Sequence, residues 1–202
     1  STLYQLRRRY QLKNELQQEY YVPVTIVVPA HNEQITIRST IESLLKLHYK
    51  LYEIVIVDDG STDQTAAILR DAFRMRQIAR PIHRSVPCQE VEAVYETREF
   101  KVPITLICKK NGGKSDALNM GINAARYPYF ICMDADSVLQ YDSLEKIVRP
   151  VLEEGSVVAV GGAVRPCNGA EIRDGRVISY RMPDKILPCM QVLEYDLSLI
   201  HI

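Results

Sequence analysis

The sequence predicts an α/β domain built around a mostly parallel β-sheet. Two patterns support this fold: from Val22 onward, short β-branched runs alternate with amphipathic runs of helix length, and four apolar runs end directly in polar residues. The chain has 202 residues, of which 47% are hydrophobic, so it can bury one sizeable core. Because ligands of open α/β sheets bind beyond the carboxyl ends of the strands, the polar strand ends are expected to form one site.

The composition narrows the classes of partner. The 25 basic and 25 acidic residues cancel, so no overall charge attracts the chain to nucleic acid, which is not an expected partner. The five cysteines form no CxxC pair and no zinc-like spacing. No apolar stretch approaches the roughly 20 residues of a membrane-spanning helix, so the chain is expected to be soluble.

Residues 1–21 are polar and compatible with a helix that carries a basic cluster, Arg7 to Arg9 with Lys13. A solvated helix is one interpretation. The other is a juxtamembrane segment attracted to anionic lipid head groups, which requires a membrane anchor elsewhere. Residues 22–202 are expected to form the domain itself.

Five runs rich in β-branched and apolar residues are too short for helices and are predicted to be strands. They are Val24–Pro29, Ile54–Val57, Ile104–Cys108, Tyr129–Met133 and Val157–Arg165. The last run contains Gly161 and Gly162, whose missing side chains suit a close approach by a ligand or another backbone.

Four longer amphipathic runs are predicted to be helices. They are Gln34–Leu47, Thr62–Arg76, Ser115–Ala125 and Ser143–Glu153. Ser61 or Thr62 can cap the second helix, and Ser115 the third. The charged stretch Gln77–Pro103 interrupts the alternation as an insertion, with a lid, a partner surface and a mobile loop as the alternatives.

Two carboxylates, Asp134 and Asp136, directly follow the strand Tyr129–Met133. Because side chains two residues apart leave the same face of an extended backbone, both can share a hard divalent cation. Oxygen ligands favour Mg²⁺ or Mn²⁺, since no cysteine or histidine is spaced to join them. The alternative is an ordinary strand-to-helix turn in which Asp and Ser make local hydrogen bonds.

A second acidic pair, Asp58 and Asp59, follows the strand Ile54–Val57. One of these carboxylates could accept a hydrogen bond from a base or a ribose hydroxyl. The alternative is helix capping by the DDGSTD stretch, although a cap requires only one acid directly after the strand.

The other two strand ends carry a glycine-lysine turn and a glutamate. The stretch from Asn111 to Lys114 offers flexible glycines and an ammonium group to phosphate oxygens, or is a generic turn with a solvated lysine. Glu33 faces the same crevice, or stabilises the helix dipole. His31 is expected to be a hydrogen-bonded structural histidine. Together these residues suit a nucleoside diphosphate with its metal ion.

These stretches resemble the family-2 inverting glycosyltransferases of the GT-A fold. The matching stretches are VTIVVPAHNE, EIVIVDDGSTDQT, KKNGGKSDALNMGINAARYPYFICMDADS and VVAVGGAVRPCNG, in the family's order. The third is most similar to membrane-embedded bacterial polysaccharide synthases of the poly-N-acetylglucosamine, chitin and hyaluronan type. The resemblance implies a GT-A, Rossmann-like sandwich that stops before the acceptor and base region.

The resemblance also implies roles for individual residues. The nucleotide-sugar-binding residues would be Pro29, Ala30, Glu33, Asp58, Asp59, Lys114, Asp134, Ala135 and Asp136. Ala30 and Glu33 would lie by the nucleoside, and Asp58 or Asp59 would contact the uracil. Lys114 would lie near the diphosphate, and Asp134 near the ribose and diphosphate. Asp136 would be the principal ligand of Mg²⁺ or Mn²⁺, with Asp134 as the second.

The implied reaction is metal-dependent transfer of a sugar, with inversion, from a UDP-sugar such as UDP-N-acetylglucosamine to a glycan or cell-envelope polysaccharide. The family's general base, and the QxxRW motif of its processive members, are expected beyond Ile202. No catalytic residue is therefore assigned, and the chain is expected to bind donor without turnover. The full-length protein is expected at the cytoplasmic face of the bacterial inner membrane, attached through segments absent from this chain.

Two other functions stay open from the sequence. One is a non-catalytic nucleotide-sugar-binding or assembly module that keeps the crevice without the chemistry. The other is a sugar nucleotidyltransferase, which is disfavoured because PAHNE stands where such enzymes carry a glycine-rich signature.

Overall fold

The computed structural model describes residues 22–154, 156–162, 170–173 and 176–180. The chain divides into two compact units, Ser1–Leu45 with Tyr49–Val138, and Lys46–His48 with Leu139–Ile202. The helix expected within residues 1–21 lies outside the described residues.

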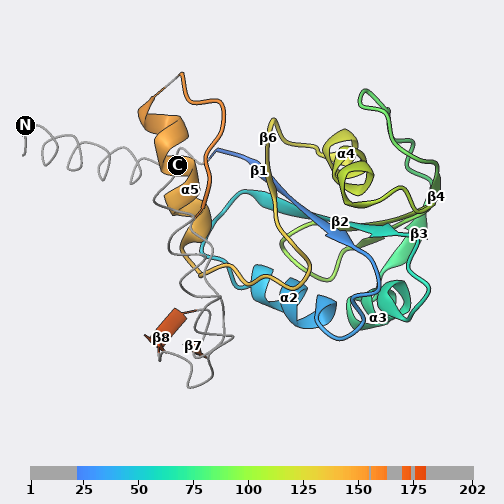
Figure 1. The fold of residues 1–202 in the computed structure, drawn as a ribbon, viewed down its shortest axis with the longest axis horizontal. Helices are drawn as coiled ribbons and strands as arrows, with labels where there is room; N and C mark the ends of the chain where they lie inside the picture. The colour runs from blue at the N-terminus through green and yellow to red at the C-terminus, as the bar shows by residue number, and fades with distance from the viewer. Residues whose placement is uncertain (1–21, 155, 163–169, 174–175, 181–202) are drawn as a thin grey trace, which may run out of the picture. The chain divides into compact units, whose positions relative to one another are not determined.

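A six-stranded sheet forms the centre of the first unit, in the order β3-β4-β5-β2-β1-β6 (Figure 1). Its strands are β1 (Val24–Ala30), β2 (Tyr52–Asp59), β3 (Arg76–Ile78), β4 (Val91–Thr97), β5 (Ile104–Lys109) and β6 (Tyr129–Cys132). The strands β1, β2, β5 and β6 are parallel, and at one edge β4 pairs in antiparallel fashion with both β5 and β3. The predicted α/β fold with a mostly parallel sheet is therefore confirmed.

Helices cover both faces of this sheet. Figure 1 shows α4 (Lys114–Ala124) on one face and α2 (Ile37–Leu44) and α3 (Thr65–Ala72) on the other. Helix α2 is amphipathic and buries four side chains with helical spacing: Ile37, Thr40, Ile41 and Leu44. The central strands β1 and β2 are buried almost throughout because both of their faces are covered.

The core beneath α4 joins this helix to the sheet. Its buried members are Val55, Val57, Val94, Ile107, Ala117, Met120 and Ala124. Helix α4 lies directly against β1 at Gly121, where an added Cβ atom would come within 2.2 Å of Val27 Cγ1. This close packing fixes the position of the α4 N-terminus relative to the ends of the central strands.

The predicted helices form, but two of them begin later than predicted. Helix α2 begins at Ile37 rather than Gln34, and α3 at Thr65 rather than Thr62, because the preceding residues join two loops by hydrogen bonds. The predicted caps are wrong. Asp63 accepts the Thr65 N–H at 2.9 Å, and Ser115 lies within α4.

The predicted insertion Gln77–Pro103 contains strand β4 and most of β3. Its backbone extends the sheet through antiparallel pairing with β5, and Ile82, Cys88 and Val91 pack against the core. The mobile-loop interpretation is therefore wrong for the paired part. The alternation of strand and helix runs did not reveal β3 and β4, because these edge strands are only partly buried and their residues are not predominantly apolar.

The second unit contains α5 (Ser143–Glu153), which has the predicted bounds, and the antiparallel pair β7 (Ala170–Arg173) and β8 (Arg176–Tyr180). The predicted strand Val157–Arg165 is wrong for residues 157–162, which are irregular and include Val158, a residue that is 99% exposed. Its last three residues lie outside the described part.

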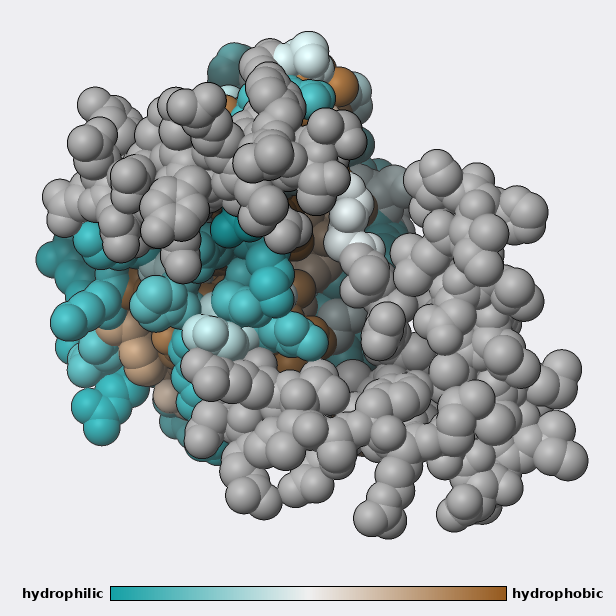
Figure 2. All heavy atoms as spheres, turned by 90° about the vertical axis from the view of Figure 1, so that its left-hand side faces the viewer, coloured by the Kyte–Doolittle hydropathy of each residue, from teal (hydrophilic) through white to brown (hydrophobic). Residues whose placement is uncertain are grey.

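No helix in the described ranges is long and apolar enough to span a bilayer. On the face shown in Figure 2, most of the coloured atoms belong to hydrophilic residues, with smaller hydrophobic areas between them.

Candidate functional site

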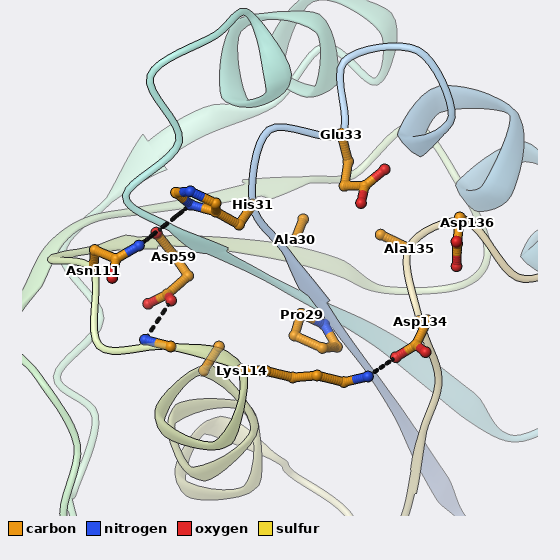
Figure 3. A pocket seen from close by; sticks show the side chains of 12 residues that line it. Pro29, Ala30, His31, Glu33, Asp59, Asn111, Lys114, Asp134, Ala135 and Asp136 are labelled. Carbon is orange, nitrogen blue, oxygen red and sulfur yellow. Dashed lines mark hydrogen bonds and ion pairs between the residues drawn. The ribbon is translucent and has the colours of Figure 1, made fainter.

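A cavity of about 330 Å³ opens at the carboxyl ends of the parallel strands, within the first unit. It is lined by Pro29, Ala30, His31, Glu33, Asp59, Asn111, Gly113, Lys114, Ala117, Asp134, Ala135 and Asp136. These residues come from the ends of β1, β2, β5 and β6 and from the start of α4 (Figure 3). The four polar strand ends therefore meet at one cavity, as the sequence predicts.

Two loops on one side of the cavity, β1–α2 and β2–α3, are fastened together by hydrogen bonds. Asn32, with a positive φ of 57°, donates its N–H to Ser61 Oγ at 2.9 Å and accepts the Thr62 N–H at 2.8 Å. The Glu33 N–H donates to Thr65 Oγ1 at 2.8 Å. These bonds fix the backbone from which the Glu33 side chain reaches the cavity.

Glu33 takes only the first of the two roles that the sequence left open, because α2 begins at Ile37 and has no acidic residue in its first turn, so the helix-dipole interpretation is wrong. Its carboxylate lines the cavity and accepts a hydrogen bond from Thr36 Oγ1 at 2.8 Å. Its carbonyl oxygen accepts the Ile37 N–H at 3.0 Å at the start of α2. Helix initiation therefore orients a carboxylate that stays in the cavity wall.

The two adjacent acids at the end of β2 have different environments. Asp59 lines the cavity, whereas Asp58 does not, and Asp58 is only 5% exposed. Burial raises the pKa of Asp58, and hydrogen bonds from Ser61 partly offset this effect. Its Oδ1 has no hydrogen-bond partner among the described residues. Of the two candidates for a ligand contact, the geometry favours Asp59.

Asp59 is held by the turn that precedes α4. Its Oδ1 accepts the Gly112 N–H at 3.0 Å and its Oδ2 accepts the Gly113 N–H at 2.7 Å. Its carbonyl oxygen accepts Nδ2 of Asn111 and the ring Nδ1 of His31, each at 2.9 Å. His31 thus makes the structural hydrogen bond expected of it.

A buried lysine completes this arrangement. Lys109, the last residue of β5, is 0% exposed and forms ion pairs with Asp59 and, at 2.7 Å, with Asp116. Burial alone would lower the pKa of Lys109, but the hydrogen bonds and charges of Asp116 and Asp59 raise it above its ordinary value. Lys109 therefore stays charged beneath the cavity.

Lys114 and the acids after β6 lie on the other side of the cavity. Lys114 Nζ forms an ion pair with Asp134 Oδ1 at 2.5 Å, and both side chains are more than half exposed. Figure 3 shows the Lys114 side chain extended across the cavity toward Asp134, with Asp136 beyond Ala135. An ammonium group and two carboxylates from separate segments are thus available to a ligand.

The acids after β6 fit a divalent cation only in part. Among the described residues, no three His, Cys, Asp or Glu side chains are grouped as metal ligands. Asp134 and Asp136 both line the cavity. Two carboxylates fit Mg²⁺ or Mn²⁺ that takes its other ligands from a bound phosphate and water.

The structure places every sequence-predicted site residue at this cavity except Asp58, which lies buried behind it. The sequence reasoning missed the structural role of Lys109. The sequence shows that β5 ends in Lys109 as β2 ends in Asp59, but that these two residues are partners follows from the parallel register seen in the structure. Strand register, however, is not readable from one sequence.

Comparisons with known proteins agree on one family. A family model described as "Glycosyl transferase family 2" matches residues 25–87 and 89–193. The poly-beta-1,6-N-acetyl-D-glucosamine synthases of Staphylococcus aureus strain COL and of Staphylococcus epidermidis are each 30% identical over 149 residues. Each match covers 74% of this chain, and the chain spans only 30% of the length of these curated relatives.

Among solved structures, a mannosyltransferase from Pyrobaculum calidifontis in complex with GDP-Man and Mn²⁺ is similar, with a TM-score of 0.51 and 21% identity. The match covers 82% of this chain and 43% of that one. This likeness confirms the predicted fold of the GT-A type.

Proposed function

The chain belongs to glycosyl transferase family 2, and from that premise we propose that its cavity is the donor site of an enzyme that transfers a hexose from a UDP-sugar. The observation that carries the proposal is the meeting of Asp59, Lys114 and the acids Asp134 and Asp136 at one cavity. Such a set suits a nucleoside diphosphate, because an ammonium group and a cation offset the charge of two phosphates.

Each side of the cavity has a proposed partner on the donor. Asp59 and Glu33 lie on the side assigned to the nucleoside, together with the backbone at Pro29 and Ala30. Lys114 is assigned to the diphosphate, and its pairing with Asp134 must open or rearrange as the donor enters. Ala135 allows a close approach because it presents only a methyl group between the two acids.

Asp136 and Asp134 would hold Mg²⁺ or Mn²⁺. When bound, the cation would withdraw negative charge from the leaving diphosphate. Lys114 would also neutralise charge on the diphosphate and help to orient the donor for attack at its anomeric carbon.

The proposed reaction is a single displacement with inversion. A hydroxyl oxygen of the acceptor forms a bond to the anomeric carbon as the bond from that carbon to the β-phosphate oxygen breaks. The bonding electrons leave with UDP, and the hydroxyl proton passes to a general base to which no residue of this chain is assigned. The described residues thus supply donor binding and leaving-group stabilisation.

The donor and acceptor are proposed from the relatives. Their name indicates a polymer of N-acetylglucosamine, so UDP-N-acetylglucosamine is the proposed donor and a polysaccharide of the cell envelope the proposed acceptor. The full-length protein is proposed to act at the cytoplasmic face of the bacterial inner membrane, as in the membrane-embedded synthases that the sequence resembles.

Calorimetric titration with UDP, with and without Mn²⁺, tests the donor site. We expect binding that depends on Mn²⁺, and we expect Asp136→Ala to abolish that dependence because it removes a ligand of the cation. Ser137→Ala is the matched control, since the Ser137 N–H bonds the Asp134 carbonyl and the backbone hydrogen bond survives the substitution. Equal, metal-dependent binding by both variants would contradict the assignment of Asp136.

A further inference from the structure

We infer that Lys109 is a positioning residue for the donor site, whose buried ammonium group holds Asp59 and thereby fixes the Gly112–Gly113 turn that presents Lys114. The inference rests on the proposed function, since Lys114 is the group assigned to the diphosphate. Lys109 itself is 0% exposed and does not line the cavity, so it acts only through its neighbours.

The Lys109 ammonium group uses three N–H donors on three acceptors. It donates to Asp59 Oδ1, to Asp116 Oδ1 at 2.7 Å and to the carbonyl oxygen of Lys110 at 2.8 Å. A buried ammonium group is tolerated only when it is paired and hydrogen-bonded. The complete set of partners therefore indicates one fixed position for the side chain.

Asp59 transmits this constraint to the turn. Its two carboxylate oxygens accept the successive N–H groups of Gly112 and Gly113, at 3.0 and 2.7 Å. Lys114 follows as the first residue of α4. Because the carboxylate bridges the buried ammonium and both amides, displacement of Asp59 would displace the backbone that carries Lys114.

The shape of the turn depends on its glycines. Gly113 has a positive φ of 89°, a conformation that favours glycine. An added Cβ atom at Gly112 would come within 2.6 Å of Asp116 Cγ and 2.8 Å of Gln89 Cγ. The turn therefore fits closely between Asp59 on one side and Asp116 on the other.

Asp116 extends the network to a third segment. Its carboxylate oxygens accept the Gln89 N–H at 3.1 and 3.0 Å, just before β4. The bonds from Lys109 and Gln89 lower the pKa of Asp116, despite the opposing effect of burial. Lys109 thus joins the end of β2, the first turn of α4 and the chain that enters β4.

Lys109 and Lys114 have different positions relative to the cavity and therefore different proposed roles. Lys114 is 63% exposed and reaches into the cavity, whereas Lys109 is buried behind it. A purely structural role and a positioning role therefore predict different effects of a Lys109 substitution on donor affinity. A residue that only stabilises the fold would lower stability without changing donor affinity, whereas a positioning residue changes affinity although it cannot touch the donor.

The first test compares Lys109→Met with Glu53→Gln in calorimetric titrations with UDP and Mn²⁺. Glu53 is a matched control because it is a buried charged residue of the same sheet, in β2 and 1% exposed, and it accepts hydrogen bonds from Thr25 Oγ1 and the Arg126 N–H, each at 2.7 Å. We expect Lys109→Met to weaken UDP binding about ten-fold or more, and Glu53→Gln to lower the melting temperature with unchanged affinity.

The outcomes separate the two proposals. If the wild-type chain does not bind UDP, the proposed function fails. If the wild type binds and folded Lys109→Met binds equally well, the donor site stands and the role of Lys109 is overturned. Weakened binding by both Lys109→Met and Glu53→Gln would also overturn it, because it would show a general effect of stability.

A second measurement uses the wild type and does not depend on whether Lys109→Met folds. Amide hydrogen exchange at Gly112 and Gly113 reports whether their N–H groups are bonded to Asp59. We expect both amides to be protected without ligand and to change little when UDP and Mn²⁺ bind, because the turn is already formed. Protection that appears only with UDP would overturn the inference.

Discussion

The two ends of strand β2 each bury a carboxylate in a charged network, and the cavity described above opens at the carboxyl end. Glu53 near the amino end is 1% exposed, and Asp59 at the carboxyl end is 3% exposed. They are six residues apart on one strand, or about 20 Å. The same device, a buried acid with nearby cations, thus occurs at both ends of the sheet.

The partners of the two acids explain the difference. Glu53 is bonded to Thr25 on β1 and to the backbone of Arg126, which follows α4 and also pairs with Glu96. Its carboxylate therefore links regular elements to each other. Asp59 is bonded to a glycine turn and a buried lysine, so its carboxylate shapes a loop beside open space. A buried charge stabilises a sheet at one end and defines a site at the other.

The largest effect is expected from the exposed lysine at the carboxyl end. Lys114→Ala should weaken UDP binding about ten-fold to a hundred-fold, because hydrogen bonds to charged groups contribute about 1.5 to 3 kcal/mol. Arg126→Ala removes an exposed cation at the amino end and should leave UDP affinity unchanged. Calorimetric titration with UDP measures the affinity of both variants. Similar losses of UDP affinity would contradict the assignment of the donor site to the carboxyl end of the sheet.

Packing of α4 on β1 gives the next prediction. Gly121→Ala should lower the free energy of unfolding by about 1 to 3 kcal/mol, since its Cβ atom would overlap Val27. Urea unfolding measures this loss. UDP affinity at temperatures where the variant is folded should change little, because Gly121 does not line the cavity. Unchanged stability would mean that the helix can shift away from the strand.

Gly113→Ala should have a smaller effect on stability and a clear effect on binding. The positive φ of 89° should lower the free energy of unfolding by about 1 kcal/mol. Open space surrounds the Cβ position, so strain rather than collision is the cause. UDP affinity should fall as the turn relaxes. Full affinity in Gly113→Ala would show that the turn geometry is not required.

The smallest effect concerns Asp58, which is buried behind the cavity. Its pKa in the folded chain is raised above its ordinary value of 3.8 by burial, so the folded state loses stability as pH rises from about 4 through the raised pKa. Asp58→Asn lacks this penalty, and its stability relative to wild type should therefore increase between pH 4 and pH 7. Urea unfolding at both values provides the measurement, and a pH-independent difference would contradict it.

The sequence predicts the residues that line the cavity better than it predicts the residues that hold them in position. Strand ends carry their polar residues in the sequence itself, so Glu33, Lys114, Asp134 and Asp136 could be assigned to one crevice before the structure was known. The choice between Asp58 and Asp59 could not be made, because adjacent strand residues point to opposite faces.

The contacts that the sequence did not reveal all depend on register or pairing. Lys109 meets Asp59 only because β2 and β5 pair with these residues opposite each other. The antiparallel strand β4 and the irregular residues 157–162 likewise depend on edges and partners that periodicity does not specify. Tertiary context decided each of these cases.

The most direct test of the donor site uses the paramagnetism of Mn²⁺. In a ¹⁵N-labelled chain with UDP, substoichiometric Mn²⁺ should broaden the amide signals of Lys114, Asp134 and Asp136 most strongly, while those of Glu53 and Arg126 remain sharp. Broadening centred on Glu53 and Arg126, or spread evenly over the sheet, would contradict a cation-assisted donor site at the carboxyl end.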